Sequence, residues 1–230
     1  MSKTIAVCGK GGTGKTTLAA LIIRWLLKNR RGVSILAVDG DPNSNLDRAL
    51  GVKSESSIVA IVDEVSRNPG QIPQGMTKDR FLDYQIHDSL VESDGFDLLV
   101  MGRPEGPGCY CFANNLLRIL IERLGKNYSY MIVDNEAGME HFSRRTTRKI
   151  DLLFIVSDYS IIGLRSAKRI LDLTRELELD VRDVRLIINR APFASLTGSG
   201  LIASILNFGP DRSCSMQIGF LNSLAVSRTR

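Results

Sequence analysis

The sequence contains few of the residues that mark specialised classes of protein. Its 230 residues include four cysteines, two histidines and one tryptophan, and no apolar run reaches the roughly 18 residues of a membrane span. The cysteines, at positions 8, 109, 111 and 214, are too few and too unevenly spaced for a disulfide framework. A strand-like run begins at residue 4, which does not resemble a secretory leader. We therefore expect a cytoplasmic protein with reduced thiols and no membrane partner.

Charge of one sign is not in large excess either. The chain has 30 Lys and Arg residues against 25 Asp and Glu, a net charge of +5. Residues 1–190 hold 27 of these bases and 24 of the acids, so the excess there is 27 minus 24, or 3. No basic stripe interleaved with aromatic residues stands out, so we expect no nucleic-acid partner. Hydrophobic residues make up 43% of the chain, which is enough to fill a globular core.

Short apolar runs alternate with helical patterns along most of the chain. There are six such runs, and five of them are nearly free of polar residues, as strands buried on both faces of a parallel sheet must be. They cover residues 4–8, 33–38, 98–101, 130–133, 152–156 and 184–188. Helical periodicity covers residues 16–30, 114–124 and 163–177. This alternation predicts a single α/β domain with a mainly parallel sheet and helices on both faces.

A glycine-rich segment lies between the first apolar run and the first helical pattern. Gly9-Lys-Gly-Gly-Thr-Gly-Lys15-Thr16 matches the phosphate-loop motif G-x-x-x-x-G-K-[ST]. Glycines let backbone N–H groups curl around phosphate oxygens, Lys15 would reach the β and γ phosphates, and the Thr16 hydroxyl would hold Mg²⁺. The expected nucleotide contacts in this loop are Gly9, Lys10, Gly11, Gly12, Thr13, Gly14, Lys15, Thr16 and Thr17.

The same glycines also match the dinucleotide-binding fingerprint. Gly9-x-Gly11-x-x-Gly14 has the required spacing, and Asp39 lies downstream at the end of the second run. A dinucleotide does not need the Lys-Thr-Thr that follows Gly14, whereas a Mg²⁺-triphosphate does. The motif therefore favours ATP over a nicotinamide cofactor.

Lys10 gives the loop an additional lysine immediately after its first glycine. In this form, Lys10-Gly-Gly-Thr-Gly-Lys15-Thr-Thr, the loop resembles that of the dimeric ATPases that include the nitrogenase iron protein, the cell-division-site ATPases and the arsenical pump ATPase. The resemblance implies a P-loop NTPase that hydrolyses ATP to ADP and phosphate and closes as a homodimer around the nucleotide. Lys10 would then reach across the dimer interface onto the partner's ATP.

Two acidic motifs strengthen the resemblance. Asp39-Gly-Asp41 resembles the first switch of these ATPases, where the second aspartate orients the attacking water. Asp134-Asn-Glu-Ala-Gly resembles the second switch, where the aspartate holds the water shell of Mg²⁺. The implied Mg²⁺ ligands, direct or through water, are Thr16, Asp41 and Asp134, and the implied catalytic residues are Lys10, Lys15 and Asp41.

The end of the last apolar run carries a further match, and the pattern stops there. Asn189 and Arg190 resemble the adenine contact of the family. The next forty residues hold one acid and three bases, so 10% are charged, against 24% for the whole chain. We therefore divide the chain into an ATPase core, residues 1–190, and an atypical tail, residues 191–230. We expect that the tail lacks the family's structure. An altered reading frame from about residue 191 would explain the abrupt change in composition.

The segment after the third apolar run narrows the resemblance. Gly102-Arg-Pro-Glu-Gly-Pro-Gly-Cys109-Tyr-Cys111 is similar to the accessory ATPases that insert nickel into carbon monoxide dehydrogenase. The resemblance implies a metallochaperone whose client is carbon monoxide dehydrogenase or acetyl-CoA synthase. Cys109 and Cys111 from two subunits would supply four thiolates across the two-fold axis, a set that suits Zn²⁺ or Ni²⁺.

Three other interpretations stay open at this point. The two thiols could simply pack a loop. The chain could also be a nucleotide-dependent regulatory or partitioning ATPase without a metal, whose output is a partner protein. An iron–sulfur reductase resembling the nitrogenase iron protein would need a cysteine after the second switch, and residues 139–145 contain none.

Overall fold

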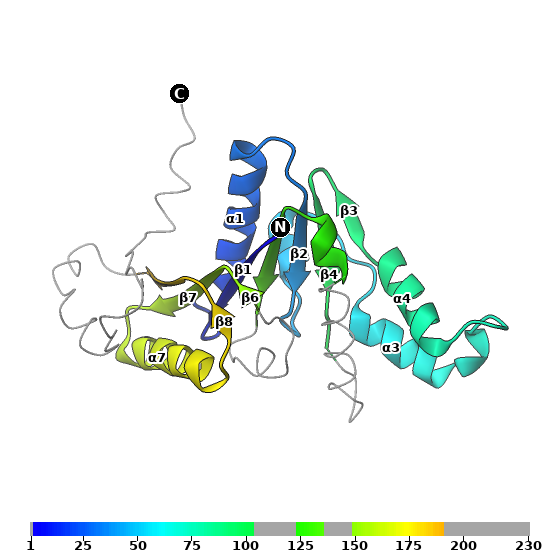
Figure 1. Ribbon diagram of the computed structural model, residues 1–230. Helices are drawn as coiled ribbons and strands as arrows, with labels where there is room; N and C mark the ends of the chain where they lie inside the picture. Colours follow the sequence, from blue (N-terminus) through cyan, green and yellow to red (C-terminus); the bar gives the residue numbers. More distant parts are fainter. Residues whose placement is uncertain (1, 104–122, 136–148, 191–230) are drawn as a thin grey trace.

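The computed structural model describes residues 2–103, 123–135 and 149–190, which form a twisted sheet flanked by helices (Figure 1). Within these residues, the main sheet has seven strands in the order β3-β4-β2-β5-β1-β7-β9. All neighbouring strands are parallel except β3, which pairs antiparallel with β4 at one edge. The strands are β1 (Lys3–Gly9), β2 (Ile35–Asp39), β3 (Val91–Ser93), β4 (Phe96–Val100), β5 (Tyr130–Asp134), β7 (Leu152–Asp158) and β9 (Val184–Asn189).

Helices cover both faces of this sheet. The helices are α1 (Lys15–Asn29), α2 (Leu46–Leu50), α3 (Ile58–Arg67), α4 (Lys78–Asp88) and α7 (Ile161–Glu176), with 3₁₀ turns η1 (Pro69–Gln71) and η2 (Gly125–Asn127). Side chains alternate along each strand, so Ile35 and Ala37 face α1, whereas Leu36 and Val38 face α3 and α4. Ala6, on β1, faces α7 in the same way. The helices α3, α4 and α7 therefore share one face of the sheet, and α1 and α2 lie on the other.

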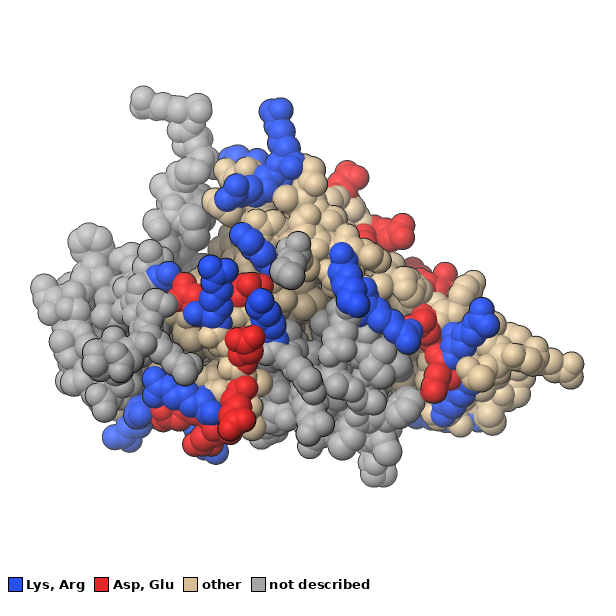
Figure 2. Space-filling model, viewed as in Figure 1, with Lys and Arg blue, Asp and Glu red and all other residues tan. Residues whose placement is uncertain are grey.

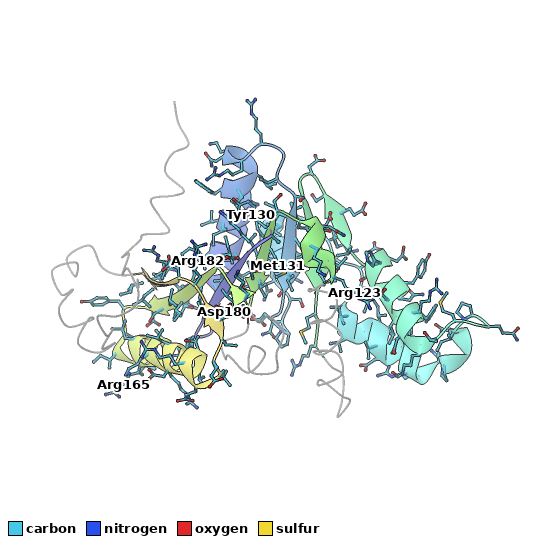
Figure 3. All side chains as sticks on the ribbon, viewed as in Figure 1. Arg123, Tyr130, Met131, Arg165, Asp180 and Arg182 are labelled. Atoms are coloured by element: carbon cyan, nitrogen blue, oxygen red, sulfur yellow. The ribbon has the colours of Figure 1, made fainter. Side chains whose placement is uncertain are left out.

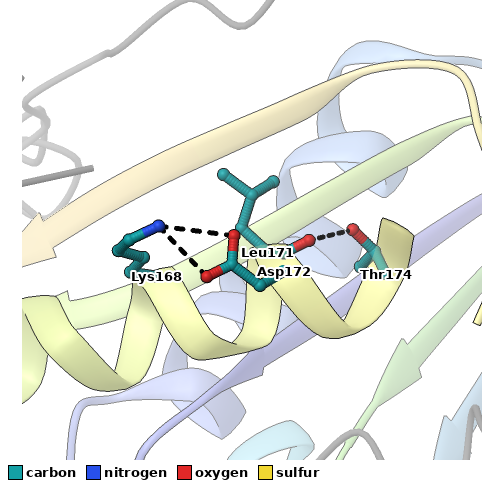
Figure 4. A network of polar contacts seen from close by, with 4 residues as sticks. All are labelled: Lys168, Leu171, Asp172 and Thr174. Atoms are coloured by element: carbon teal, nitrogen blue, oxygen red, sulfur yellow. Dashed lines mark hydrogen bonds and ion pairs between the residues drawn. The ribbon is translucent and has the colours of Figure 1, made fainter. Parts of the chain in front are cut away.

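Helix α7 shows how a surface helix is held on the sheet (Figure 4). Its inner side buries Leu164, Ile170 and other apolar residues against β7 and β9. Toward solvent, Lys168 Nζ lies 3.1 Å from Asp172 Oδ2, an i,i+4 ion pair worth a few tenths of a kcal/mol. Basic and acidic side chains are interspersed over this helix on the face drawn in Figure 2. A short second sheet, β6 (Lys149–Ile150) with β8 (Asp180–Val181), ties the two ends of this β7–α7 unit together.

The α/β class and the parallel sheet are confirmed, and each of the six apolar runs forms a strand. The sequence analysis missed the antiparallel edge strand β3 and the helices α2, α3 and α4. On α1, Trp25 is 50% exposed although it is the chain's one tryptophan, whereas the small residues Ala19 and Ala20 are buried. The expected helix at 114–124 lies almost wholly outside the described residues. Among the described residues, no helix is long and apolar enough to cross a membrane.

The carboxyl ends of five neighbouring strands meet at one edge of the sheet. Asp39 of β2 and Asp134 of β5 are directly paired in register, as are Asp158 of β7 and Asn189 of β9. Gly9, the last residue of β1, lies between these two pairs because β1 is the strand between β5 and β7. In open α/β sheets, ligands bind at this edge, so the fold alone brings the candidate site residues together.

Candidate nucleotide-binding site

The phosphate loop turns directly from β1 into α1, and its glycines make the turn possible. Gly9 has φ 150°, and a Cβ at this position would collide with the carbonyl oxygen of Val156 on β7. Gly14 caps α1 in the left-handed region with φ 97°, so the helix begins at Lys15. The first N–H groups of α1 therefore point toward the loop, where an anion is favoured.

Inside the loop, one backbone carbonyl gathers three donors. The Lys10 carbonyl oxygen accepts hydrogen bonds from Thr13 Oγ1 at 2.8 Å, from Thr13 N at 3.4 Å and from Lys15 Nζ at 3.5 Å. The Lys15 and Thr13 side chains are buried, whereas Lys10, Gly11 and Gly12 are exposed at the tip of the loop. The loop thus directs the Lys15 ammonium toward its own Lys10 carbonyl.

Asp39 closes the loop that follows β2. Its side chain is completely buried, with Oδ1 accepting from the Asp41 N–H at 3.1 Å and Oδ2 from the Leu46 N–H at 2.9 Å. Burial raises the pKa of Asp39 to about 6, and these two hydrogen bonds partly counteract the rise. The residue therefore fixes both ends of the 41–46 loop, a positioning role that its place in the switch motif did not specify.

Asp41, the expected catalytic aspartate, lies at the start of this loop. Its Oδ1 accepts from the backbone N–H of Asn43 at 2.9 Å and from Asn43 Nδ2 at 3.0 Å. These bonds form a turn that holds the carboxylate near the strand end rather than free in solvent. The side chain is partly exposed, which leaves it accessible to water and nucleotide.

Asp134 is a buried carboxylate, and neither of its oxygens has a hydrogen-bond partner among the residues that the structure describes. Burial raises its pKa to about 7; the nearby Thr16 hydroxyl and Lys15 ammonium lower this pKa in part, and the charge of Asp39 raises it. The Thr16 hydroxyl is close enough to lower this pKa, but it forms no hydrogen bond of good geometry with either carboxylate oxygen. Such an orphaned carboxylate next to a phosphate loop suits a hard cation, so Thr16 and Asp134 would hold Mg²⁺ and its waters. When bound, Mg²⁺ would neutralise charge on the phosphates.

Two asparagines contribute to the site in ways that the sequence did not reveal. Asn135 is buried, and its Nδ2 donates to the carbonyls of Val7 and Val133, both at 3.1 Å, which fixes the start of the second switch. Asn189, expected at adenine, donates from Nδ2 to the carbonyl of Thr13 in the phosphate loop at 2.9 Å. The adenine contact of Asn189 and Arg190 stays a prediction.

Asp158 is a further charged residue at this edge. Its Oδ1 accepts from the Ser160 hydroxyl and N–H, and Ser160 in turn caps α7. The Ser160 hydroxyl bond lowers the pKa of Asp158, and the charges of Lys10 and Arg190 lower it further. The sequence analysis did not single out Asp158. Its place at the end of an apolar run, two residues before the serine that starts a helix, could have identified it.

The expected transition-metal ligands cannot be placed in the same way. Cys109 and Cys111 lie outside the described residues, as do Glu136 and the rest of the second switch. The cysteine that the structure describes is Cys8, which is buried in β1. Burial raises the pKa of its thiol to about 12, so this cysteine remains neutral and packs the core.

A glycine-rich loop joins the first strand to the first helix, and two buried carboxylates lie at the ends of adjacent strands. This combination defines a P-loop ATPase. Residues 4–196 match the CobQ/CobB/MinD/ParA nucleotide binding domain, and the chain belongs to this family. The expected ATPase class is thereby confirmed. A ParA family ATPase from Chlorobium tepidum has the same fold, with a TM-score of 0.68 over 98% of this chain and 88% of that one, at 23% identity.

Two relatives are more similar in sequence. An uncharacterized ATP-binding protein of Methanocaldococcus jannaschii is 47% identical over 188 residues, which are 81% of this chain and 74% of the relative. The carbon monoxide dehydrogenase accessory protein CooC of Rhodospirillum rubrum is 33% identical over 217 residues, covering 85% and 82% of the two chains. The sequence is thus similar to ATP-binding proteins and to a carbon monoxide dehydrogenase accessory protein.

Proposed function

We propose that this ATPase is a nickel metallochaperone for carbon monoxide dehydrogenase or acetyl-CoA synthase. ATP closes a homodimer, Cys109 and Cys111 of both subunits bind Ni²⁺, or Zn²⁺ at rest, and hydrolysis of ATP to ADP and phosphate reopens the dimer for transfer. The similarity to CooC and the Cys-x-Cys pair support this function. Four thiolates from two subunits form a set that neither subunit supplies alone.

The observation that carries the proposal is the contact between the first switch and the residue after β4, from which the chain continues to the two cysteines. Met101, just after β4, donates its N–H to the carbonyl of Asp39 at 2.9 Å. On the other side of the segment, Arg123 (Figure 3) forms an ion pair with Asp83 of α4, with NH1 3.4 Å from Oδ2. Movement of the first switch would therefore be transmitted through the end of β4 to the segment with both cysteines.

The cysteine pair provides the direct test. In a Cys109→Ser/Cys111→Ser variant, we expect nickel to fall from about one ion per two chains to background, because the thiolates are its soft ligands. ATP hydrolysis should stay within about two-fold of wild type, since the phosphate loop is intact. The measurement is metal content by mass spectrometry after gel filtration with ADP or ATP. Cys214→Ser, at a cysteine without an assigned role, is the control.

A double variant that retains nickel at the wild-type level would contradict the metal role. It would favour the alternative of a nucleotide-dependent regulatory or partitioning ATPase, whose output is a partner protein. An iron–sulfur centre, the other alternative, would show iron and acid-labile sulfide in anaerobically purified wild-type protein, and we expect neither.

Two exposed isoleucines support a dimer face beside the phosphate loop. Ile161 and Ile162, in the first turn of α7, are 60% and 64% exposed. They follow β7, whose Val156 is paired with Gly9, so they lie at the same edge of the sheet as Lys10. Apolar side chains at this position would be buried when a second copy approaches Lys10 and the nucleotide.

The double substitution Ile161→Ser/Ile162→Ser should weaken the ATP-dependent dimer by at least about 10-fold in Kd, because each buried isoleucine contributes about 1.5–3 kcal/mol. Sedimentation velocity with ATP and Mg²⁺ measures this Kd. Tyr84→Ser, on α4 and 62% exposed, is the matched control and should leave the Kd unchanged. Equal dimerisation of wild type and the isoleucine variant would place the interface elsewhere.

A further inference from the structure

The last strand of the main sheet contacts the first loop of the chain through one side chain. Asn189 ends β9, and its Nδ2 donates to the Thr13 carbonyl oxygen at 2.9 Å, across 176 residues of sequence. The β-sheet places it there, because Asp158 is paired with Asn189 and the preceding part of β7 is paired with the end of β1.

The orientation of the Asn189 amide is determined by its two partners. Its Oδ1 accepts from the Arg190 N–H at 2.9 Å, while its Nδ2 faces a carbonyl that can only accept. A flipped amide would set oxygen against oxygen and N–H against N–H, so a single orientation satisfies both groups. Arg190 has φ 58°, a left-handed conformation that brings its N–H back toward this oxygen.

The residue that Asn189 holds is the center of the phosphate loop's internal bonding. Thr13 donates through both its hydroxyl and its N–H to the Lys10 carbonyl, to which the Lys15 ammonium is also directed. The Thr13 side chain is 1% exposed, so the residue cannot move without breaking these contacts. Asn189, Thr13 and Lys10 thus form a continuous chain from β9 to the tip of the loop.

We infer that Asn189 is a positioning residue of the phosphate loop, which holds Thr13, and through it Lys10 and Lys15, in the conformation that receives phosphates. This role precedes nucleotide binding and does not depend on which base is bound. It concerns the ATPase common to the family and does not rest on the nickel proposal. A variant that fails to bind nickel would not contradict the positioning role of Asn189. Likewise, loss of the positioning role would not contradict nickel binding.

The Asn189→Asp variant provides a pH-dependent readout. At pH 8 the introduced carboxylate keeps the acceptor for Arg190 N–H but faces the Thr13 carbonyl without a donor, so ADP should bind at least about 10-fold more weakly than to wild type. Lone pairs of that carbonyl raise the pKa of the introduced carboxyl. Near pH 5 it becomes a neutral O–H donor, and affinity should return to within about three-fold.

Calorimetric titration with ADP and Mg²⁺ from pH 5 to 8 gives the Kd of each variant. Each Kd is divided by the Kd of the wild type at the same pH. The division removes the titration of Asp39 and Asp134 and the charges of Lys10, Asp158 and Arg190, which all variants share. Asn189→Ala, without donor or acceptor, should show a loss of about five-fold that does not change with pH. A ratio for Asn189→Asp that is flat with pH would overturn the positioning role.

Hydrogen exchange of the nucleotide-free protein separates this role from an adenine contact. In Asn189→Ala, peptides covering residues 10–14 should exchange about five-fold faster, whereas those of β7 and α7 should not change. A residue that acts only on adenine would leave exchange in the free protein at the wild-type rate, and this result would overturn the inference. Asn29→Ala is the matched control, because Asn29 Nδ2 donates to the Trp25 carbonyl at 2.8 Å, away from the site.

Discussion

A Lys15→Ala variant is expected to hydrolyse ATP with a kcat/KM about 100- to 1000-fold below wild type. The Lys15 side chain is 6% exposed and rests 3.5 Å from the Lys10 carbonyl, a weak contact that phosphate oxygens would replace. Because the ammonium would face charge that develops on the phosphates in a site shielded from water, its loss removes stabilisation that water cannot restore. Phosphate release at saturating and at low ATP separates the effects on kcat and KM.

Lys28→Ala is the control for this experiment. Lys28 lies on the same helix, in its last turn and exposed, so its loss removes the same charge far from the loop. We expect its kcat/KM to remain within about two-fold of wild type, as is usual for a surface substitution. If Lys15→Ala retained a tenth or more of the wild-type rate, the nucleotide would be bound elsewhere or by another lysine.

The strands and the phosphate loop were predictable because their signals are local. A strand buried on both faces must be apolar along most of its length, and β2 shows this directly, because residues 35–38 are apolar and buried and only its last residue, Asp39, is polar. The phosphate loop is likewise continuous in sequence, since its glycines and Lys15 act within eight residues of one another. Its position between β1 and α1 then follows from the order of the elements.

The helices α3 and α4 were missed although their starts carry recognisable signals. Ser57 accepts the N–H of Ala60 at the start of α3, and Thr77 accepts that of Arg80 at the start of α4. The apolar residues that follow each cap pack against the face of the sheet around Leu36. Attention to caps, rather than to apolar periodicity alone, would have identified both helices.

The contacts among site residues were not predictable, because they join distant segments. The bond from Asn189 to Thr13 depends on β9 being next to β7 and β7 next to β1, an order that no sequence spacing expresses. The full burial of Asp39 and Asp134 has the same origin, since it arises from neighbouring strands rather than from flanking residues. The sequence identified the candidate residues. Whether each of them binds a ligand or holds a loop depends on the assembled sheet.

The burial of Asp134 in the assembled sheet lowers the stability of the folded protein when its carboxyl group is ionised. Burial raises the pKa of Asp134 from its ordinary 3.8 to about 7, so the folded protein binds a proton more tightly than the unfolded chain does. The stability linked to this group is therefore fully present below about pH 4 and is lost as pH rises through 7. Above pH 7 this leaves a buried carboxylate that accepts no hydrogen bond from the described part of the chain.

An Asp134→Asn variant removes this charge while keeping the size of the side chain. Without Mg²⁺ and nucleotide at pH 8, it should unfold with a free energy about 2–4 kcal/mol higher than wild type, or about 5–10 °C higher in Tm. The difference should shrink toward zero near pH 4, because the wild-type carboxyl is then neutral as well. Thermal unfolding at a series of pH values measures both effects.

The same variant should lose at least about 100-fold in Mg²⁺-dependent ATP hydrolysis, because a neutral amide is a poor partner for the water shell of a hard cation. Mg²⁺ and ATP should also raise the Tm of wild type but not that of the variant. Asp172→Asn, which removes only the exposed partner of Lys168, is the control and should change stability by less than about 1 kcal/mol. A variant less stable than wild type at pH 8 would show that the carboxylate of Asp134 has a stabilising partner. If instead stability rises and activity is lost together, this buried carboxylate is maintained for the cation at the expense of the fold.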